Sequence, residues 1–215
     1  MSVKSNLLSI KDSIPNNVCL VAVSKTKPNE LILEAYKNGQ RVFGENKVQE
    51  LVDKHAALPN DIEWHMIGHL QTNKVKYIAP FINLIHSVDS IKLIKEINKK
   101  AKSNNRVIDC LIQVHIAKEE SKFGIPIYEV DEFYIKCQEY ENVRIKGVMG
   151  MATFTKDSAI VSEEFKSLKL VYEKLKSNYP TIDILSCGMS GDYNLALEQG
   201  SNMIRIGSTI FGGRQ

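Results

Sequence analysis

The run Val18-Cys19-Leu20-Val21-Ala22-Val23-Ser24 is apolar almost throughout instead of alternating with polar residues. A strand of this kind is typical of parallel sheets that are buried on both faces. Working outward along the chain, seven further short runs qualify as strands: Arg41–Phe43, Glu63–Ile67, Leu84–Ser87, Ile108–His115, Ile145–Met149, Ile182–Ser186 and Met203–Ile206. The sequence therefore predicts eight strands.

Helical patterns separate these runs. One apolar stripe, with the 3-4 spacing that places one helix face on a sheet, contains Phe165, Leu168, Tyr172, Leu175 and Tyr179. Ser90 is a good N-cap for another helix, and Gly39 is a typical helix stop after Asn38. Residues 1–12 are also expected to form a short amphipathic helix, not a signal peptide.

Eight strand–helix units over 215 residues give about 27 residues per unit, the spacing of a (β/α)8 TIM-type barrel near its lower size limit. An open doubly wound α/β sheet is the alternative. It is weakened because no glycine fingerprint follows the first strand. No linker or composition break divides the chain, so we predict a single domain over residues 1–215.

Composition excludes several classes of protein. The net charge of +3 is mild and the basic residues are scattered, so nucleic acid is not an expected partner. No run reaches the length of a membrane span, and the four cysteines form no C-x-x-C pair, which suits a reducing cytoplasm. We expect a cytoplasmic protein without a metal site, and a monomer, because no large exposed apolar helix face is evident.

The ends of the last two strands carry glycine and serine. In this fold, the loops after strands seven and eight are the usual phosphate site. Gly188 and Gly207 let backbone N–H groups approach a phosphate, while Ser190 and Ser208 offer hydroxyls. The alternative is that both segments are ordinary glycine–serine turns.

Two charged residues sharpen this hypothesis. Arg205 lies in an otherwise apolar strand end, where it faces either a structural carboxylate or an acceptor on a ligand. Lys25 directly follows the first strand, so its amine is expected at the barrel mouth, partly desolvated and available for Schiff-base formation. Lys27 and Lys122 are rival nucleophiles, both expected in loops.

Other chemical motifs are missing: the sequence has no G-x-x-x-x-G-K-[ST], H-E-x-x-H or G-x-S-x-G. His65 and His69 are four residues apart, but His65 belongs to a strand pattern, which argues against zinc.

At these strand ends the sequence resembles the YggS/PROSC family of pyridoxal phosphate-binding proteins over nearly its whole length. Six segments carry the resemblance: Val23–Pro28, Phe43–Glu50, Trp64–Lys74, Ser121–Gly124, Ser186–Asp192 and Arg205–Gly212. Each is a weak motif alone, but one per βα unit in this order is highly specific.

The resemblance implies a barrel similar to the N-terminal domain of alanine racemases, with pyridoxal 5′-phosphate bound as a Schiff base on Lys25. It implies a pyridine nitrogen near Arg205, and it places the phosphate at Ser190, Gly207 and Ser208. Ser186, Met189 and Asn46 are expected to lie close to the cofactor. Family members are not known to catalyse a defined reaction, and they are linked to the balance of pyridoxal phosphate, amino acids and keto acids.

Three functions follow. A carrier or buffer would hold the cofactor, have no catalytic residue and pass the cofactor on, with cofactor-dependent apoenzymes as candidate partners. A weak amino-acid racemase is the second, but a two-base racemase needs acid–base groups on both faces of the cofactor, one supplied by a further domain. An arginine at the pyridine nitrogen would also weaken the ring as an electron sink. The third, an aldolase-like enzyme acting through a lysine Schiff base, would need Glu45 as its proton shuttle.

Overall fold

Eight parallel strands form a closed barrel in this computed structural model, which describes residues 2–118 and 123–213. The pairing order β4-β3-β2-β1-β9-β8-β7-β5 closes through a β4–β5 pairing, which confirms the barrel and excludes the open sheet. The barrel strands are β1 (Cys19–Val23), β2 (Val42–Glu45), β3 (Glu63–Met66), β4 (Leu84–Val88), β5 (Ile108–His115), β7 (Val143–Met149), β8 (Ile184–Met189) and β9 (Met203–Ile206). A two-residue strand, β6 (Ile125–Pro126), pairs only with the end of β5.

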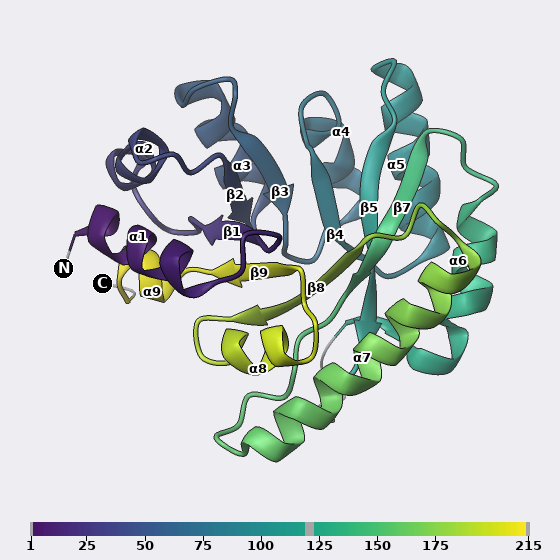
Figure 1. Cartoon of the computed structure of the whole chain (residues 1–215). Helices are drawn as coiled ribbons and strands as arrows, with labels where there is room; N and C mark the ends of the chain where they lie inside the picture. Colours follow the sequence, from purple (N-terminus) through teal and green to yellow (C-terminus); the bar gives the residue numbers. More distant parts are fainter. Residues whose placement is uncertain (1, 119–122, 214–215) are drawn as a thin grey trace.

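Each barrel strand is followed by a helix on the outside of the ring (Figure 1). The helices are α1 (Val3–Ser13), α2 (Asn29–Lys37), α3 (Val48–Ala57), α4 (Val75–Ile78), α5 (Ile91–Ser103), α6 (Val130–Cys137), α7 (Ser158–Asn178), α8 (Tyr193–Glu198) and α9 (Ser208–Phe211). Short 3-10 turns precede α4 (Thr72–Lys74) and α6 (Ile127–Glu129). The first helix packs beside the last, α1 against α9, so the two ends of the described chain lie together (Figure 1).

Most of the predicted local signals hold. Ser90 caps α5 by accepting from the Leu93 N–H, and Gly39, at φ +82°, follows the end of α2. The stripe on α7 is buried from Phe165 to Leu175, but Tyr179, its last predicted member, is the extended C-cap of the helix and only half-buried. None of the helices in the described part of the chain is long and apolar enough to cross a membrane.

The barrel interior changes from apolar to polar along its axis. Val21, Leu84, Leu111, Met149 and Met203 form one buried apolar cluster inside the ring. Two residues further along, three of these strands carry polar side chains: His86, Gln113 and Arg205. Since side chains on a strand alternate between faces, these polar groups also point inward, above the apolar layer.

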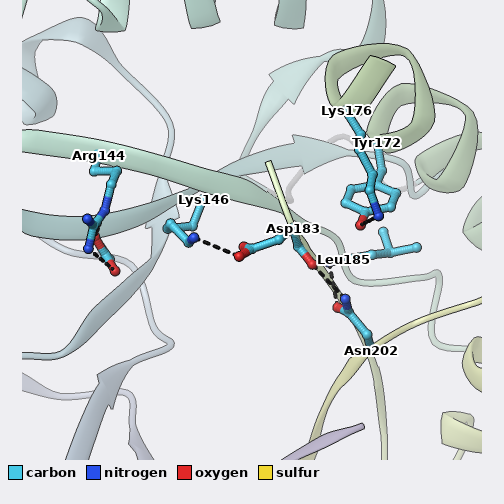
Figure 2. A network of polar contacts seen from close by, with 8 residues as sticks. Arg144, Lys146, Tyr172, Lys176, Asp183, Leu185 and Asn202 are labelled. Carbon is cyan, nitrogen blue, oxygen red and sulfur yellow. Dashed lines mark hydrogen bonds and ion pairs between the residues drawn. The ribbon is translucent and has the colours of Figure 1, made fainter. Parts of the chain in front are cut away.

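Polar contacts join β7, β8 and β9 near their amino ends (Figure 2). Lys146 forms an ion pair with Asp183 at 2.6 Å. Asn202 accepts from the Leu185 N–H at 2.8 Å and donates to the Asp183 carbonyl at 2.6 Å. These contacts hold β7, β8 and β9 in register, whereas the exposed charge pairs themselves add little stability.

The seventh barrel strand differs from its predicted range. We expected it at Ile182–Ser186, but β8 runs from Ile184 to Met189 and shifts register between Ser186 and Met189 against β9. Gly188 lies inside this irregular stretch at φ +97°, and a Cβ there would lie 2.7 Å from the Ala196 Cβ. Bulges of this kind often stand beside functional sites because they redirect side chains.

Candidate functional site

A cavity of about 520 Å³ opens at the carboxyl ends of the strands, the end at which barrel enzymes carry their sites. Its wall includes seven of the eight residues predicted from the sequence: Lys25, Asn46, Met189, Ser190, Arg205, Gly207 and Ser208. The eighth, Ser186, is fully buried beneath the cavity and contacts Arg205 instead of lining the wall.

The Lys25 side chain is half-buried in this wall. Within the described residues, no hydrogen bond or ion pair involves its amine, so the nitrogen is available to a ligand. Lys27 also lines the cavity, but its Nζ donates to the carbonyls of Gly212 and Gly213 at 3.0 and 2.8 Å. The third candidate, Lys122, lies outside the described residues, as does Ser121 of the same segment.

A buried charge cluster holds the backbone on both sides of Lys25. Lys54, on α3, donates to the Ser24 carbonyl at 2.7 Å and forms ion pairs with Glu45 at 2.8 Å and Glu50 at 2.7 Å. Ser24 Oγ donates to Glu45 at 2.6 Å, and the Thr26 N–H donates to Glu50 at 2.5 Å.

The same cluster fixes an uncommon backbone conformation. Thr26 has φ +62°, which a β-branched residue seldom adopts and which persists only where surrounding contacts hold it. Burial raises the pKa of Glu45, although hydrogen bonds from Lys54 and Ser24 act in the opposite direction. Sequence reasoning missed this cluster, although Glu50 and Lys54 stand four residues apart on one helix, a spacing that could have indicated it.

Arg205 is 4% exposed at the base of the cavity. Its Nη1 donates to Ser186 Oγ at 2.6 Å and its Nη2 donates to the Gly150 carbonyl at 3.0 Å. Among the described residues, no carboxylate forms an ion pair with it. Burial lowers the pKa of Arg205. A buried guanidinium held only by neutral acceptors keeps its positive charge available to a ligand in the cavity.

The β8–α8 and β9–α9 turns meet at Ser190. Its Oγ accepts from the N–H groups of Gly207 at 3.2 Å and Thr209 at 3.5 Å. These two N–H groups converge on one oxygen, which is the arrangement that binds a phosphate oxygen. Asp192 also lines the cavity, but one of its carboxylate oxygens accepts from the Met189 N–H within the turn.

Asn46 and Met189 complete the wall. The side-chain oxygen of Asn46 is buried and has no hydrogen-bond partner in the described part of the chain, so it offers an acceptor to a ligand. The β8 irregularity pairs Met189 with Arg205, which brings this side chain to the cavity mouth, where it is 37% exposed.

The two histidines considered as zinc ligands, His65 and His69, lie in different places. His65 points into the barrel and contacts His86, whereas His69 stacks on Phe123 at the mouth and pairs with Asp89 at 3.3 Å. Among the described residues, no group of three histidine, cysteine or acidic side chains converges as a metal site requires.

Comparison with known proteins finds similarity along almost the whole chain. The family model described as "Alanine racemase, N-terminal domain" matches residues 1–215. The chain is 42% identical to the pyridoxal phosphate homeostasis protein of Vibrio alginolyticus over 205 residues, covering 93% of this chain and 88% of that protein. It is 37% identical to the protein of the same name from Escherichia coli K12, covering 97% and 95%.

Solved structures agree with the fold. PipY of Synechococcus elongatus without pyridoxal phosphate superposes with a TM-score of 0.93 at 33% identity, covering 98% of this chain and all of that one. A second PipY structure, which has pyridoxal phosphate bound, gives 0.90. An alanine racemase of Clostridium difficile gives 0.83 at 16% identity, with 99% of this chain matching 56% of that enzyme, which shows the shared barrel alone.

Proposed function

Because the chain belongs to the alanine racemase N-terminal domain family, we propose that it binds pyridoxal 5′-phosphate in this cavity as a Schiff base on Lys25. We further propose that it serves pyridoxal phosphate homeostasis as a carrier, with no defined catalysis of its own. The names of its relatives and the cofactor bound to PipY support this assignment. When bound, the cofactor supplies an aldehyde that reacts with a primary amine.

The free amine of Lys25, opposite a cluster of anion-binding groups, is the observation that carries the proposal. Lys25 supplies the amine, and the Glu45–Lys54–Glu50 cluster holds its backbone in place. The hydroxyls of Ser190 and Ser208 would receive the phosphate together with the Gly207 and Thr209 N–H groups. These two groups donate to Ser190 Oγ in this structure and would donate to a phosphate oxygen instead. The residues present therefore fit the cofactor: an available amine, a phosphate cradle and a buried cation.

Arg205 supports a carrier over an enzyme. A guanidinium has only donors and stays protonated, so a pyridine nitrogen facing it would accept a hydrogen bond and remain unprotonated. A neutral ring withdraws electrons less strongly than a protonated one. Arg205 would therefore hold the ring in place while limiting bond cleavage at a bound amino acid, and slow exchange with free amino acids would continue.

The position of Glu45 argues against the aldolase-like alternative, which needs this residue as its proton shuttle. Glu45 is fully buried and bonded to Lys54 and Ser24, between the barrel and α3, and does not line the cavity. A racemase remains the second candidate, since the family model that matches the chain is described by the N-terminal domain of alanine racemase.

Transfer of the cofactor would test the carrier role. The loaded protein is mixed with a cofactor-free pyridoxal phosphate enzyme, and the recovery of that enzyme's activity is followed alongside loss of visible absorbance from the donor. Recovery that exceeds the rate with Lys25→Ala plus an equal amount of free cofactor supports a carrier. Racemisation of an added amino acid at an enzyme-like rate, without transfer, would favour the racemase.

A further inference from the structure

Four buried polar side chains form one hydrogen-bonded chain across the barrel interior, below the cavity. Arg205 Nη1 donates to Ser186 Oγ at 2.6 Å, Ser186 Oγ lies 3.3 Å from His86 Nδ1, and His86 Nε2 lies 3.1 Å from His65 Nδ1. They come from β9, β8, β4 and β3, and none is more than 5% exposed. The chain therefore spans the barrel from the cavity base to its far wall.

One end of the chain has a fixed direction: the guanidinium of Arg205 has no acceptor, so the Ser186 oxygen accepts from it. The roles of the ring nitrogens depend on the tautomers. If Ser186 donates to His86 Nδ1, His86 carries its proton on Nε2 and donates it to His65 Nδ1. This arrangement needs two neutral imidazoles, and burial lowers the pKa of His65 to about 3 and that of His86 well below 6.5, with His65 and the Arg205 charge adding to the effect on His86.

We propose that His86 is a positioning residue for Arg205, acting through Ser186 to fix how the guanidinium faces the bound cofactor. This inference rests on the proposed function. The acceptor that Arg205 has in the fold supports this role. A carboxylate would orient the guanidinium but cancel its charge, whereas the neutral hydroxyl of Ser186 orients it and leaves the charge directed at the cavity. His86 fixes the hydroxyl by accepting its proton, so Ser186 has a single orientation in which its lone pairs face Arg205.

Two substitutions separate this role from simple packing. His86→Asn places a side-chain oxygen near the position of Nδ1 and can still accept the Ser186 proton. His86→Leu is of similar size but accepts nothing, so the hydroxyl is free to turn and compete for other acceptors. We expect His86→Leu to bind pyridoxal phosphate roughly tenfold more weakly, because a misdirected Arg205 would lose its charge-assisted hydrogen bond to the cofactor. His86→Asn should restore most of the affinity.

The visible spectrum of the protein loaded with pyridoxal phosphate gives a second readout. A change in packing alone would not alter the pH midpoint of its visible band. The Arg205 charge beside the ring alters the pH at which the visible band of the Schiff base changes. That midpoint should shift in His86→Leu and return toward the wild-type value in His86→Asn. Equal behaviour of the two variants, whether both normal or both impaired, would overturn the proposal.

The results distinguish a failure of the proposed function from a failure of the positioning role of His86. If wild type itself binds no pyridoxal phosphate, the proposed function fails. If wild type binds and the His86 variants follow it, only this inference fails. Should His86→Leu not fold, as judged by circular dichroism, Ser186→Ala removes the Arg205 acceptor directly, and an unchanged band midpoint in that variant would equally refute the positioning role.

Discussion

Acid should weaken this fold through His65, the imidazole that points into the barrel beside His86. Burial lowers the pKa of His65 to about 3, against 6.5 in an unfolded chain. Below pH 6.5 the imidazole of the unfolded chain binds a proton, whereas His65 in the folded protein stays neutral. The free energy of unfolding is therefore highest above pH 6.5 and falls progressively as the pH drops toward about 3.

The size of this loss of unfolding free energy follows from how far the pH falls below the unfolded pKa of 6.5. Between neutral pH and about pH 5, the solution moves about 1.5 units below the unfolded pKa, at about 1.4 kcal/mol per unit. His65 alone should therefore cost the protein about 2 kcal/mol of unfolding free energy over this interval. His65→Asn does not titrate, yet its side-chain oxygen can still accept from His86, so it is the matched comparison.

Urea unfolding of the cofactor-free protein measures this directly. The single tryptophan, Trp64, is 1% exposed and precedes His65 on β3, so its fluorescence reports loss of the barrel. Wild type should lose about 2 kcal/mol more than His65→Asn between neutral pH and about pH 5, with circular dichroism as a second probe. Parallel losses in the two proteins would refute the claim that His65 stays neutral in the fold.

Three further outcomes are expected. Lys54→Met leaves Glu45 buried without its partner and should cost about 3 kcal/mol in urea unfolding; a loss below about 1 kcal/mol would show that the pair behaves as a surface ion pair. Gly147→Ala should destabilise the protein severely or prevent folding, because a Cβ there would lie 1.8 Å from the Ile184 carbonyl oxygen; a normal thermal midpoint would contradict this packing. A Cβ at Gly207 would lie 3.3 Å from the Val23 Cβ and carbonyl oxygen, so in Gly207→Ala the turn must move by a fraction of an ångström. The thermal midpoint should fall slightly, and the dissociation constant for pyridoxal phosphate should rise about tenfold because the residue-207 N–H is displaced from the phosphate. Unchanged affinity in calorimetry would exclude Gly207 from the phosphate cradle.

The strands were predictable because each is a local signal. Runs such as Val18–Ser24 are apolar on both faces, and only a closed or doubly covered parallel sheet buries both. The end of β8 could not be predicted in the same way. Gly188 interrupts the apolar pattern, as a residue at a strand end would. Only the three-dimensional packing shows that β8 continues through an irregular stretch to Met189.

The cavity wall was predictable from strand ends, since parallel strands bring their carboxyl ends to one rim. What lies behind the wall was not. The sequence placed Ser186 with the cavity residues, and its depth could not be predicted: the register pairs Ser186 with Met203, two residues before Arg205 on β9, so it lies below the guanidinium that it binds. The contact between His65 and His86 joins positions 21 residues apart, and no spacing in the sequence indicates which imidazole meets which.

Borohydride reduction of the protein loaded with pyridoxal phosphate, followed by intact mass and peptide mapping, tests for a Schiff base on Lys25. Lys25→Ala is the test variant and Lys27→Ala the matched control, because both amines line the cavity but that of Lys27 is bonded to backbone carbonyls. We predict one reduced adduct on the peptide that contains Lys25, present in wild type and Lys27→Ala and lost in Lys25→Ala. An adduct that persists in Lys25→Ala at wild-type yield, or a wild-type protein that takes up no cofactor, would contradict the account.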